Sequence, residues 1–309
     1  MRNKRIIVTG AAGKMGKHLV PRLVAMGNEV HALARFSDPV ILRAFKKLGV
    51  VTFRRDLSKP SALRGIPGDY DFVFHEAALK FGSGANFDHT AELNVRATGR
   101  VMEHFSAAKG ILMASSGNVY PDTSDGCTEQ DQPRPPSFYA MSRLGGEWMV
   151  DYFSRRNKTP AIIQRIFYAY HEEFGVPTDI ARQMRDGEPV DLTTGHVNVI
   201  WLDDMLELMI ASASLCSVPA RVLNMTGLEK VPVREIAEKL GKLMGIRPRF
   251  RGRSGPTALL GRADEMARLL WAPKVSLDEG LERVARSVMG REFPLDHPAQ
   301  WEKRDGFGA

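Results

Sequence analysis

The chain has 309 residues, of which 43% are hydrophobic and 26% charged, so it can bury a substantial core as one large domain or as a domain with a smaller lobe. No apolar run approaches the roughly 20 residues that span a bilayer, and we therefore expect no membrane partner. The only two cysteines, Cys127 and Cys216, argue against a disulfide framework and for a reducing cytoplasm.

The net charge is +7, but the 43 basic residues are interleaved with 36 acidic ones. A nucleic-acid surface gathers positive charge on one face, and here that charge is scattered along the chain. The one dense cluster, "RPRFRGR" at 247–253, fits a solvated loop or an anionic-substrate site better. We expect a small-molecule substrate and no nucleic-acid partner.

Short apolar runs alternate with longer amphipathic stretches through the first half of the chain. This rhythm is typical of βαβ units, with a parallel sheet and helices on both faces. Lys14 to Met26 predicts the first crossover helix, and Asp38 followed by Pro39 predicts the N-cap and first turn of the next. Strands are predicted at 5–9, 29–33, 50–53, 71–75, 110–115 and 160–166.

Beyond residue 167 the alternation is looser. Asp203 and Asp204 are expected to cap a helix that they open. The tail at 291–309 is rich in proline, glycine and charge, and is interpreted as an arm or a strap. Helices are predicted near 178–186, 203–215, 232–244, 261–270 and 276–289, and strands near 197–201 and 220–225.

A glycine-rich loop, "TGAAGKMG", follows the first predicted strand directly and opens into a helix. Gly10, Gly13 and Gly16 permit a tight turn and the close approach of backbone to a pyrophosphate, while the helix N-terminus offers unpaired N–H groups. The strand before the loop and the helix after it are the context that a dinucleotide site requires.

The choice of cofactor is read at the end of the second strand, where an acid would bind the ribose 2′-hydroxyl and an arginine a 2′-phosphate. Here Ala34 is followed by Arg35, with Ser37 close by and no acid at that point. An arginine fork suits a phosphate dianion, so NADP is predicted, with NAD as the alternative. Asp56, after the third strand, is placed to accept from the adenine amino group.

Several further motifs follow in a fixed order: "RDL" around Asp56, "HEAA" at 75–78, "NVRATG" at 94–99, "SSGNVY" at 115–120 and "YAMSR" at 139–143. Together with the glycine loop, these motifs resemble those of the extended short-chain dehydrogenase/reductases, the NAD(P)-dependent sugar epimerase/dehydratase group. The resemblance continues through "QRIFYAY", "VNVIWLDDM", "RVLNMTG" and "SLDEGLERV". The resemblance covers roughly residues 4 to 289.

The resemblance implies an α/β fold, a Rossmann-type doubly wound parallel sheet with a smaller C-terminal substrate-binding lobe. The NAD(P)-binding domain is expected at 1–166, rejoined by about 197–226, with 167–196 and 227–309 forming the lobe. The family often dimerises through helices of the Rossmann core, so the resemblance also implies a homodimer.

Carried over by position, Ser116 matches the family's catalytic hydroxyl, Tyr139 its acid/base and Arg143 a position usually held by lysine. Asn94 matches a structural asparagine on the fourth helix. The residues expected to bind the cofactor are Gly10, Gly13, Lys14, Met15, Gly16, Arg35, Ser37, Asp56, Leu57, Ala77, Asn94, Tyr139 and Arg143. Those expected to bind the substrate are Ser116, Asn118, Tyr168 and His196.

The expected chemistry explains these residue types. When hydride leaves a carbinol carbon for C4 of nicotinamide, the hydroxyl proton must be removed, and the reverse reaction must deliver it. A free tyrosine, with a pKa of about 10, is a poor base near neutrality. A neighbouring cation and the positive nicotinamide ring favour the phenolate, and a shift of ~2 pKa units takes about 2.7 kcal/mol.

Several positions depart from the family pattern. Arg143 keeps the charge of the usual lysine in a larger, planar group. Gly117 and Asn118 stand where sugar 4,6-dehydratases carry an acidic pair, which disfavours that activity. Tyr168 and Val197 replace an asparagine and an arginine that usually lie near a nucleotide-sugar's phosphates, which favours a smaller substrate.

The predicted function is therefore an NAD(P)-dependent oxidoreductase that moves hydride between nicotinamide and a secondary alcohol or ketone of a small polyol, sugar or sugar acid. The alternatives are a sugar or nucleotide-sugar epimerase with a retained cofactor, and a non-catalytic dinucleotide-sensing protein. No group of side chains has convincing metal-ligand spacing, so no metal is expected. His75 is expected to pack at a strand end rather than to act as a base.

Overall fold

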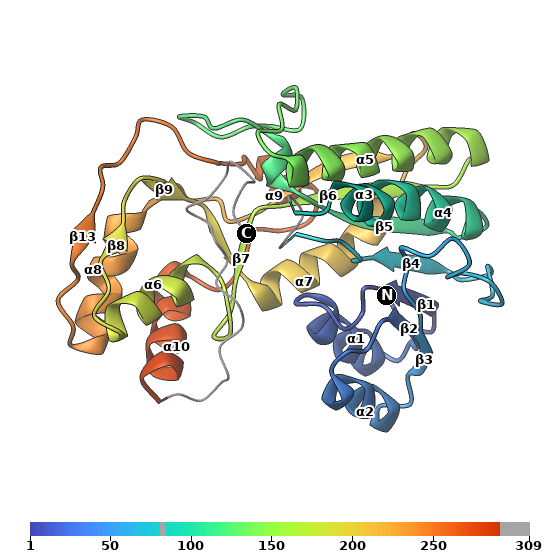
Figure 1. Cartoon of the computed structure of the whole chain (residues 1–309), viewed down its shortest axis with the longest axis horizontal. Helices are drawn as coiled ribbons and strands as arrows, with labels where there is room; N and C mark the ends of the chain where they lie inside the picture. The colour runs from blue at the N-terminus through green and yellow to red at the C-terminus, as the bar shows by residue number, and fades with distance from the viewer. Residues whose placement is uncertain (81–84, 291–309) are drawn as a thin grey trace.

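A computed structural model describes residues 1–80 and 85–290 of the chain (Figure 1). The predicted arm or strap at 291–309 lies outside these residues. Within them, no helix combines the length and the hydropathy needed to cross a bilayer.

The centre of the molecule is a seven-stranded sheet in which every pairing is parallel. Its order is β11-β6-β5-β4-β1-β2-β3, so the chain reverses its direction of travel between β1 and β4. This is the point at which doubly wound sheets open a crevice at the carboxyl ends of their strands. The strands are β1 (Arg5–Thr9), β2 (Glu29–Ala34), β3 (Val51–Arg54), β4 (Phe72–His75), β5 (Gly110–Ser116), β6 (Ala161–Ile166) and β11 (Arg221–Met225).

The apolar runs fold as strands because both faces of the sheet are covered. In β1, Ile6 and Val8 pack into one core cluster and Ile7 into another on the opposite face. The first face is covered by α1 (Gly16–Ala25), α2 (Pro39–Lys47) and α7 (Leu202–Ala211), and the second by α4 (Ala97–His104) and α5 (Phe138–Asn157) (Figure 1). Helix α3 (Phe87–Ala91) packs against α5. The predicted doubly wound α/β fold is confirmed.

Helix starts test the capping predictions. Asp38 accepts a hydrogen bond from the Val40 N–H at 2.7 Å and caps α2, as predicted. The prediction for Asp203 and Asp204 is wrong, because α7 has no side-chain cap. Asp203 instead pairs with Arg22 at 2.8 Å, and Asp204 accepts from the Lys274 and Val275 N–H groups, so both carboxylates join distant segments.

The second half of the chain builds a separate core cluster beside the sheet, on the left of Figure 1. Its helices are α6 (Val176–Arg185), α8 (Val233–Met244) and α10 (Leu277–Gly290), while α9 (Asp264–Leu269) packs near β11. The strands there are short pairs: β7 (Tyr168–Tyr170) with β10 (Val199–Trp201), β9 (His196–Val197) with β12 (Val231–Pro232), and β8 (Val190–Asp191) with β13 (Phe250–Arg251). The strand predicted at 197–201 is divided between β9 and β10.

A buried ion pair anchors α5 to the sheet. Arg165 on β6 donates to Glu147 on α5, with a shortest distance of 2.7 Å, and both side chains are almost fully buried. Ser115 donates to the same carboxylate at 2.5 Å, and Arg165 also donates to the Tyr120 hydroxyl. These bonds satisfy both charges, which makes the pair costly to break from one side.

We expect Glu147→Gln to lower the free energy of unfolding by about 3–5 kcal/mol, because it leaves the Arg165 charge buried without a counterion. Urea denaturation followed by circular dichroism measures the difference. The control is Glu103→Gln, whose carboxylate lies 3.7 Å from Arg156 between exposed side chains and should cost less than about 1 kcal/mol. Equal stability of the two variants would show that the buried pair does not hold α5 in place.

Candidate active site

The glycine-rich loop between β1 and α1 lies directly against the chain that leaves β4. Gly10 has a φ of +67°, and a Cβ there would lie 2.5 Å from the Ala77 nitrogen. A Cβ on Gly16 would lie 2.7 Å from the backbone of Ala11. The loop therefore has no room for side chains at these positions. Helix α1 starts without a side-chain cap, and its Lys17 and His18 N–H groups donate to the Gly13 and Met15 carbonyl oxygens. The positive end of the helix dipole at this N-terminus still favours an anion.

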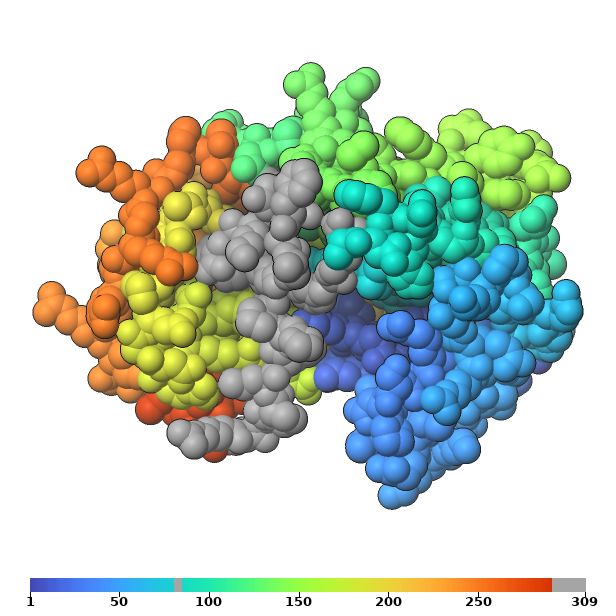
Figure 2. Space-filling model, in the orientation of Figure 1, coloured from blue at the N-terminus to red at the C-terminus, as the bar shows by residue number. Residues whose placement is uncertain are grey.

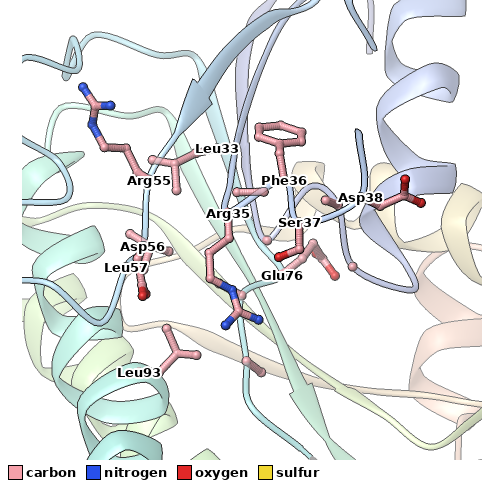
Figure 3. A pocket seen from close by; sticks show the side chains of 16 residues that line it. Leu33, Arg35, Phe36, Ser37, Asp38, Arg55, Asp56, Leu57, Glu76 and Leu93 are labelled. Carbon is pink, nitrogen blue, oxygen red and sulfur yellow. The ribbon is translucent and has the colours of Figure 1, made fainter. Parts of the chain in front are cut away.

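A first cavity of about 290 Å³ opens beside this loop at the carboxyl ends of β1, β2 and β4 (Figure 3). Arg35 points across it, whereas the guanidinium of Arg55 points away. Of the residues expected to bind the cofactor, this cavity brings together Gly10, Gly13, Arg35, Ser37, Asp56, Leu57 and Ala77.

Asp56 is held as an acceptor at the wall of the first cavity. Its carboxylate accepts from the Ser58 N–H at 3.0 Å. Partial burial opposes its ionisation, but the hydrogen bonds from Ser58 and the charge of Arg35 lower the pKa of Asp56 overall. The group is thus ionised near neutrality and can accept a hydrogen bond from a ligand.

A second cavity of about 260 Å³ adjoins the first and reaches the start of α5. It is lined by all three expected catalytic side chains, which come from the end of β5 and the first turns of α5. The Ser116 oxygen accepts from the Asn118 N–H at 3.2 Å, so its own hydrogen can point to a ligand. The expected residues that line this cavity are Lys14, Met15, Ser116, Asn118, Tyr139, Arg143 and Tyr168.

Among these residues, Arg143 gives the strongest indication that the cavity binds a ligand. Its side chain is 1% exposed, and its Nη2 donates to the Ala114 carbonyl oxygen. Its Nε and Nη1 find no hydrogen-bond partner within the described part of the chain. Because buried donors are rarely left unpaired, these two N–H groups fit acceptors of a bound molecule, such as ribose hydroxyls. The glycine loop and these donors together fit a dinucleotide.

The second tyrosine–arginine pair in the sequence has a different setting. Tyr152 and Arg156 have the same spacing as Tyr139 and Arg143, but Tyr152 is 58% exposed on the outer face of α5. Arg156 lies near Glu103 on that outer surface. The two pairs are thus separated by their surroundings and not by their spacing.

Three expected site residues line neither cavity. Asn94 is fully buried in a π-helical turn, η1 (Glu92–Arg96), ahead of α4 and not on that helix. Its amide bonds both backbone groups of Leu79 and the Ser142 hydroxyl, so it braces the segment after β4 against α5. Gly16 lies behind the loop, and His196 lies on β9 outside both cavities.

The cavities also contain residues that the sequence did not single out. Glu76 lines both of them, and Lys80 lines the second. A signal was present, because both follow β4 at the edge of the sheet where ligands bind. His75, the residue before Glu76, packs as expected: it is buried between the hydroxyls of Thr9 and Thr98, and burial lowers its pKa to about 3.

One cluster of metal-ligand types forms only in three dimensions. His18 on α1 meets His171 and Glu173, which lie between β7 and α6, and their donor atoms lie within 4.8 Å of one another. Lys17 donates to the same Glu173 carboxylate. Because the Lys17 ammonium group already pairs with the Glu173 carboxylate, the cluster is an ion-paired contact between α1 and the second core cluster.

Two curated proteins are similar in sequence to most of this chain. It is 27% identical to an L-arabinose 1-dehydrogenase (NAD(P)(+)) of Haloferax volcanii, over 64% of this chain and 77% of that one. It is 25% identical to a dTDP-4-dehydro-6-deoxy-D-allose reductase of Streptomyces bikiniensis, over 92% of this chain and 95% of the relative.

Solved structures share the fold. A UDP-glucuronic acid 4-epimerase from Bacillus cereus in complex with NAD superposes with a TM-score of 0.81 at 23% identity, over 93% of this chain and 99% of that one. The family model for the NAD dependent epimerase/dehydratase family matches residues 6–220. This match confirms the resemblance to the extended short-chain type and an NAD-dependent class of enzyme. The chain belongs to the NAD dependent epimerase/dehydratase family.

Proposed function

We propose that the protein is an NADP(H)-dependent oxidoreductase that moves hydride between C4 of nicotinamide and a secondary alcohol or ketone of a small sugar, polyol or sugar acid. The observation that carries this proposal is the second cavity, where Ser116, Tyr139 and Arg143 converge beside the glycine loop. A bound dinucleotide supplies the hydride acceptor or donor. The side chains of this cavity supply the proton transfer and the alignment.

In the oxidative direction, the Tyr139 phenolate takes the proton of the substrate hydroxyl while hydride leaves the carbinol carbon. Arg143 lies one helical turn away on α5, and its buried side chain lines the same cavity as Tyr139. Ser116 donates to the substrate oxygen, which keeps that oxygen within reach of Tyr139. In the reductive direction the same phenol returns the proton.

The preference for NADP rests on Arg35. The first cavity carries this arginine at the end of β2, where a 2′-phosphate would lie, and no acid follows the strand before Asp38. The L-arabinose 1-dehydrogenase relative is named for both NAD and NADP. NAD is the alternative cofactor.

The small substrate is favoured by the side chains at the two positions where the family usually binds a nucleotide-sugar's phosphates. Val197 is buried on β9, where it offers no charge, and the aromatic Tyr168 lines the second cavity. A sugar epimerase is the second candidate, because a UDP-glucose 4-epimerase of Mycolicibacterium smegmatis is 25% identical over 91% of this chain. An epimerase would retain its cofactor and show no net change in nicotinamide absorbance, whereas an oxidoreductase would consume free cofactor.

We further propose a cytoplasmic homodimer with a domain at 1–166 and 197–226 and a substrate lobe from the rest. The outer face of α5 supports the dimer, since Met141, Trp148 and Tyr152 are each more than half exposed at positions that share one side of the helix. These three side chains give α5 an exposed apolar face, and we propose that the α5 of a second copy packs against it.

Tyr139→Phe should lower kcat by about a hundredfold to ten-thousandfold, because it removes the group that transfers the proton. The matched control is Tyr152→Phe, which alters the exposed tyrosine with the same arginine spacing and should leave kcat unchanged. Initial rates are followed by nicotinamide absorbance over a panel of sugars and sugar acids. Full activity of Tyr139→Phe would remove this residue from the chemistry, whereas cofactor binding without turnover of any compound by the unaltered protein would favour the non-catalytic dinucleotide-sensing alternative.

Arg35→Ala should weaken NADP binding by about tenfold to hundredfold and change NAD binding little, since only NADP carries the 2′-phosphate. Calorimetric titration with each cofactor measures both affinities. Arg43→Ala, on α2 outside the cavity, controls for the loss of one surface charge. An equal loss for NAD and NADP would contradict the assignment of Arg35 to the phosphate.

A further inference from the structure

Glu76 stands at the junction of the two cavities, the position through which a dinucleotide must pass. Its N–H donates to the Thr9 carbonyl at 3.1 Å, which ties it to the end of β1 at the reversal of strand order. Its side chain lines both cavities, and Figure 3 shows it among the side chains of the first. The sequence-based site does not use this carboxyl group.

The carboxyl group of Glu76 lacks a hydrogen bond that a buried oxygen normally makes. Its Oε1 is buried and finds no hydrogen-bond partner in residues 1–80 and 85–290. Burial raises the pKa of Glu76 to about 8, against the pull of the Arg143 charge. A buried acceptor of this kind is costly unless a ligand supplies a donor.

The second cavity also contains hydrogen-bond donors that lack acceptors. Arg143 presents two buried N–H donors without a partner, and Glu76 presents a buried acceptor without one. A hydroxyl group donates one hydrogen bond and accepts others, so a vicinal diol can satisfy both residues at once. A pyrophosphate cannot, because it offers no hydrogen-bond donor to the unpaired Oε1 of Glu76.

The order of the two cavities indicates which diol is meant. The first cavity carries Arg35 and Asp56, the groups for the adenosine end, and the second carries Tyr139 and Ser116, the groups for the reacting end. A ribose between the glycine loop and Tyr139 is the one that bears nicotinamide. Lys14 lines the second cavity and provides a cation for the neighbouring phosphates.

We propose that Glu76 and Arg143 together bind the diol of the nicotinamide-bearing ribose, with the carboxyl group accepting from one hydroxyl and the guanidinium donating to the other. This contact rests on the proposed dinucleotide site and names the part of the ligand that each side chain holds. It explains how an arginine serves in place of lysine: the acid offsets the additional donors and holds the ribose in register with Tyr139.

The test compares ADP with ADP-ribose, which share the adenosine and both phosphates but differ by the second ribose. Neither has a 2′-phosphate, so Arg35 contributes equally to both. Calorimetry on the full chain should show that Glu76→Leu weakens ADP-ribose about tenfold or more and ADP less than twofold. Glu76→Gln, which keeps one acceptor, should show the same selectivity with a smaller loss.

The matched control is Asp38→Asn, an acid that also lines the first cavity but points away from its centre and whose replacement can still cap α2. It should change neither affinity, and thermal unfolding checks that each variant is folded. Equal weakening of both ligands by Glu76→Leu, or no weakening, would overturn the ribose contact alone. Failure of the unaltered protein to bind either ligand would overturn the dinucleotide site and this contact with it.

Discussion

The contact between Gly10 and the backbone of Ala77 is the constraint on which the site depends. A single added Cβ would fall 2.5 Å from the Ala77 nitrogen, so the loop after β1 and the chain after β4 can approach only with glycine there. This approach occurs where the strand order reverses. Gly10 and Ala77 therefore form part of the wall of the first cavity, next to the second, and we propose that the two cavities bind opposite ends of one extended ligand.

The reacting end depends on how firmly α5 is fixed. Ser137 caps the helix by accepting from the Ala140 N–H, which orients the first turn that carries Tyr139. Two turns further on, Glu147 joins the helix to the sheet through Arg165 and Ser115. Because Ser115 precedes Ser116, one buried network positions both hydroxyl groups of the proposed reaction. Asn94 also joins the segment after β4 to α5 through its hydrogen bonds with Leu79 and Ser142. Figure 2 shows the outer surface that α3, α4 and α5 form over this network.

Most of the sheet could be predicted because its inner strands are buried on two faces, so that each gives a local apolar run in the sequence, as in Ile6, Ile7 and Val8. The glycine loop and the Ser116, Tyr139 and Arg143 series could be found because their order along the chain carries the information. Features that depend on distant partners could not. Asp203 resembled a cap but pairs with Arg22, and the cluster of His18 with Glu173 forms only after the two cores pack. The position of Glu76 directly after β4 was a signal in the sequence, but that its Oε1 is buried without a partner depends on how distant segments pack.

The central claim is that these cavities align a nicotinamide ring with a carbinol carbon for hydride transfer. Single-turnover reduction with NADPH deuterated at C4, followed by mass spectrometry of the product, tests it most directly. The account predicts that one deuterium appears on the carbon that becomes the secondary alcohol, for at least one small sugar or sugar-acid ketone. Tight binding of the labelled cofactor with no deuterium transfer to any such ketone would contradict it.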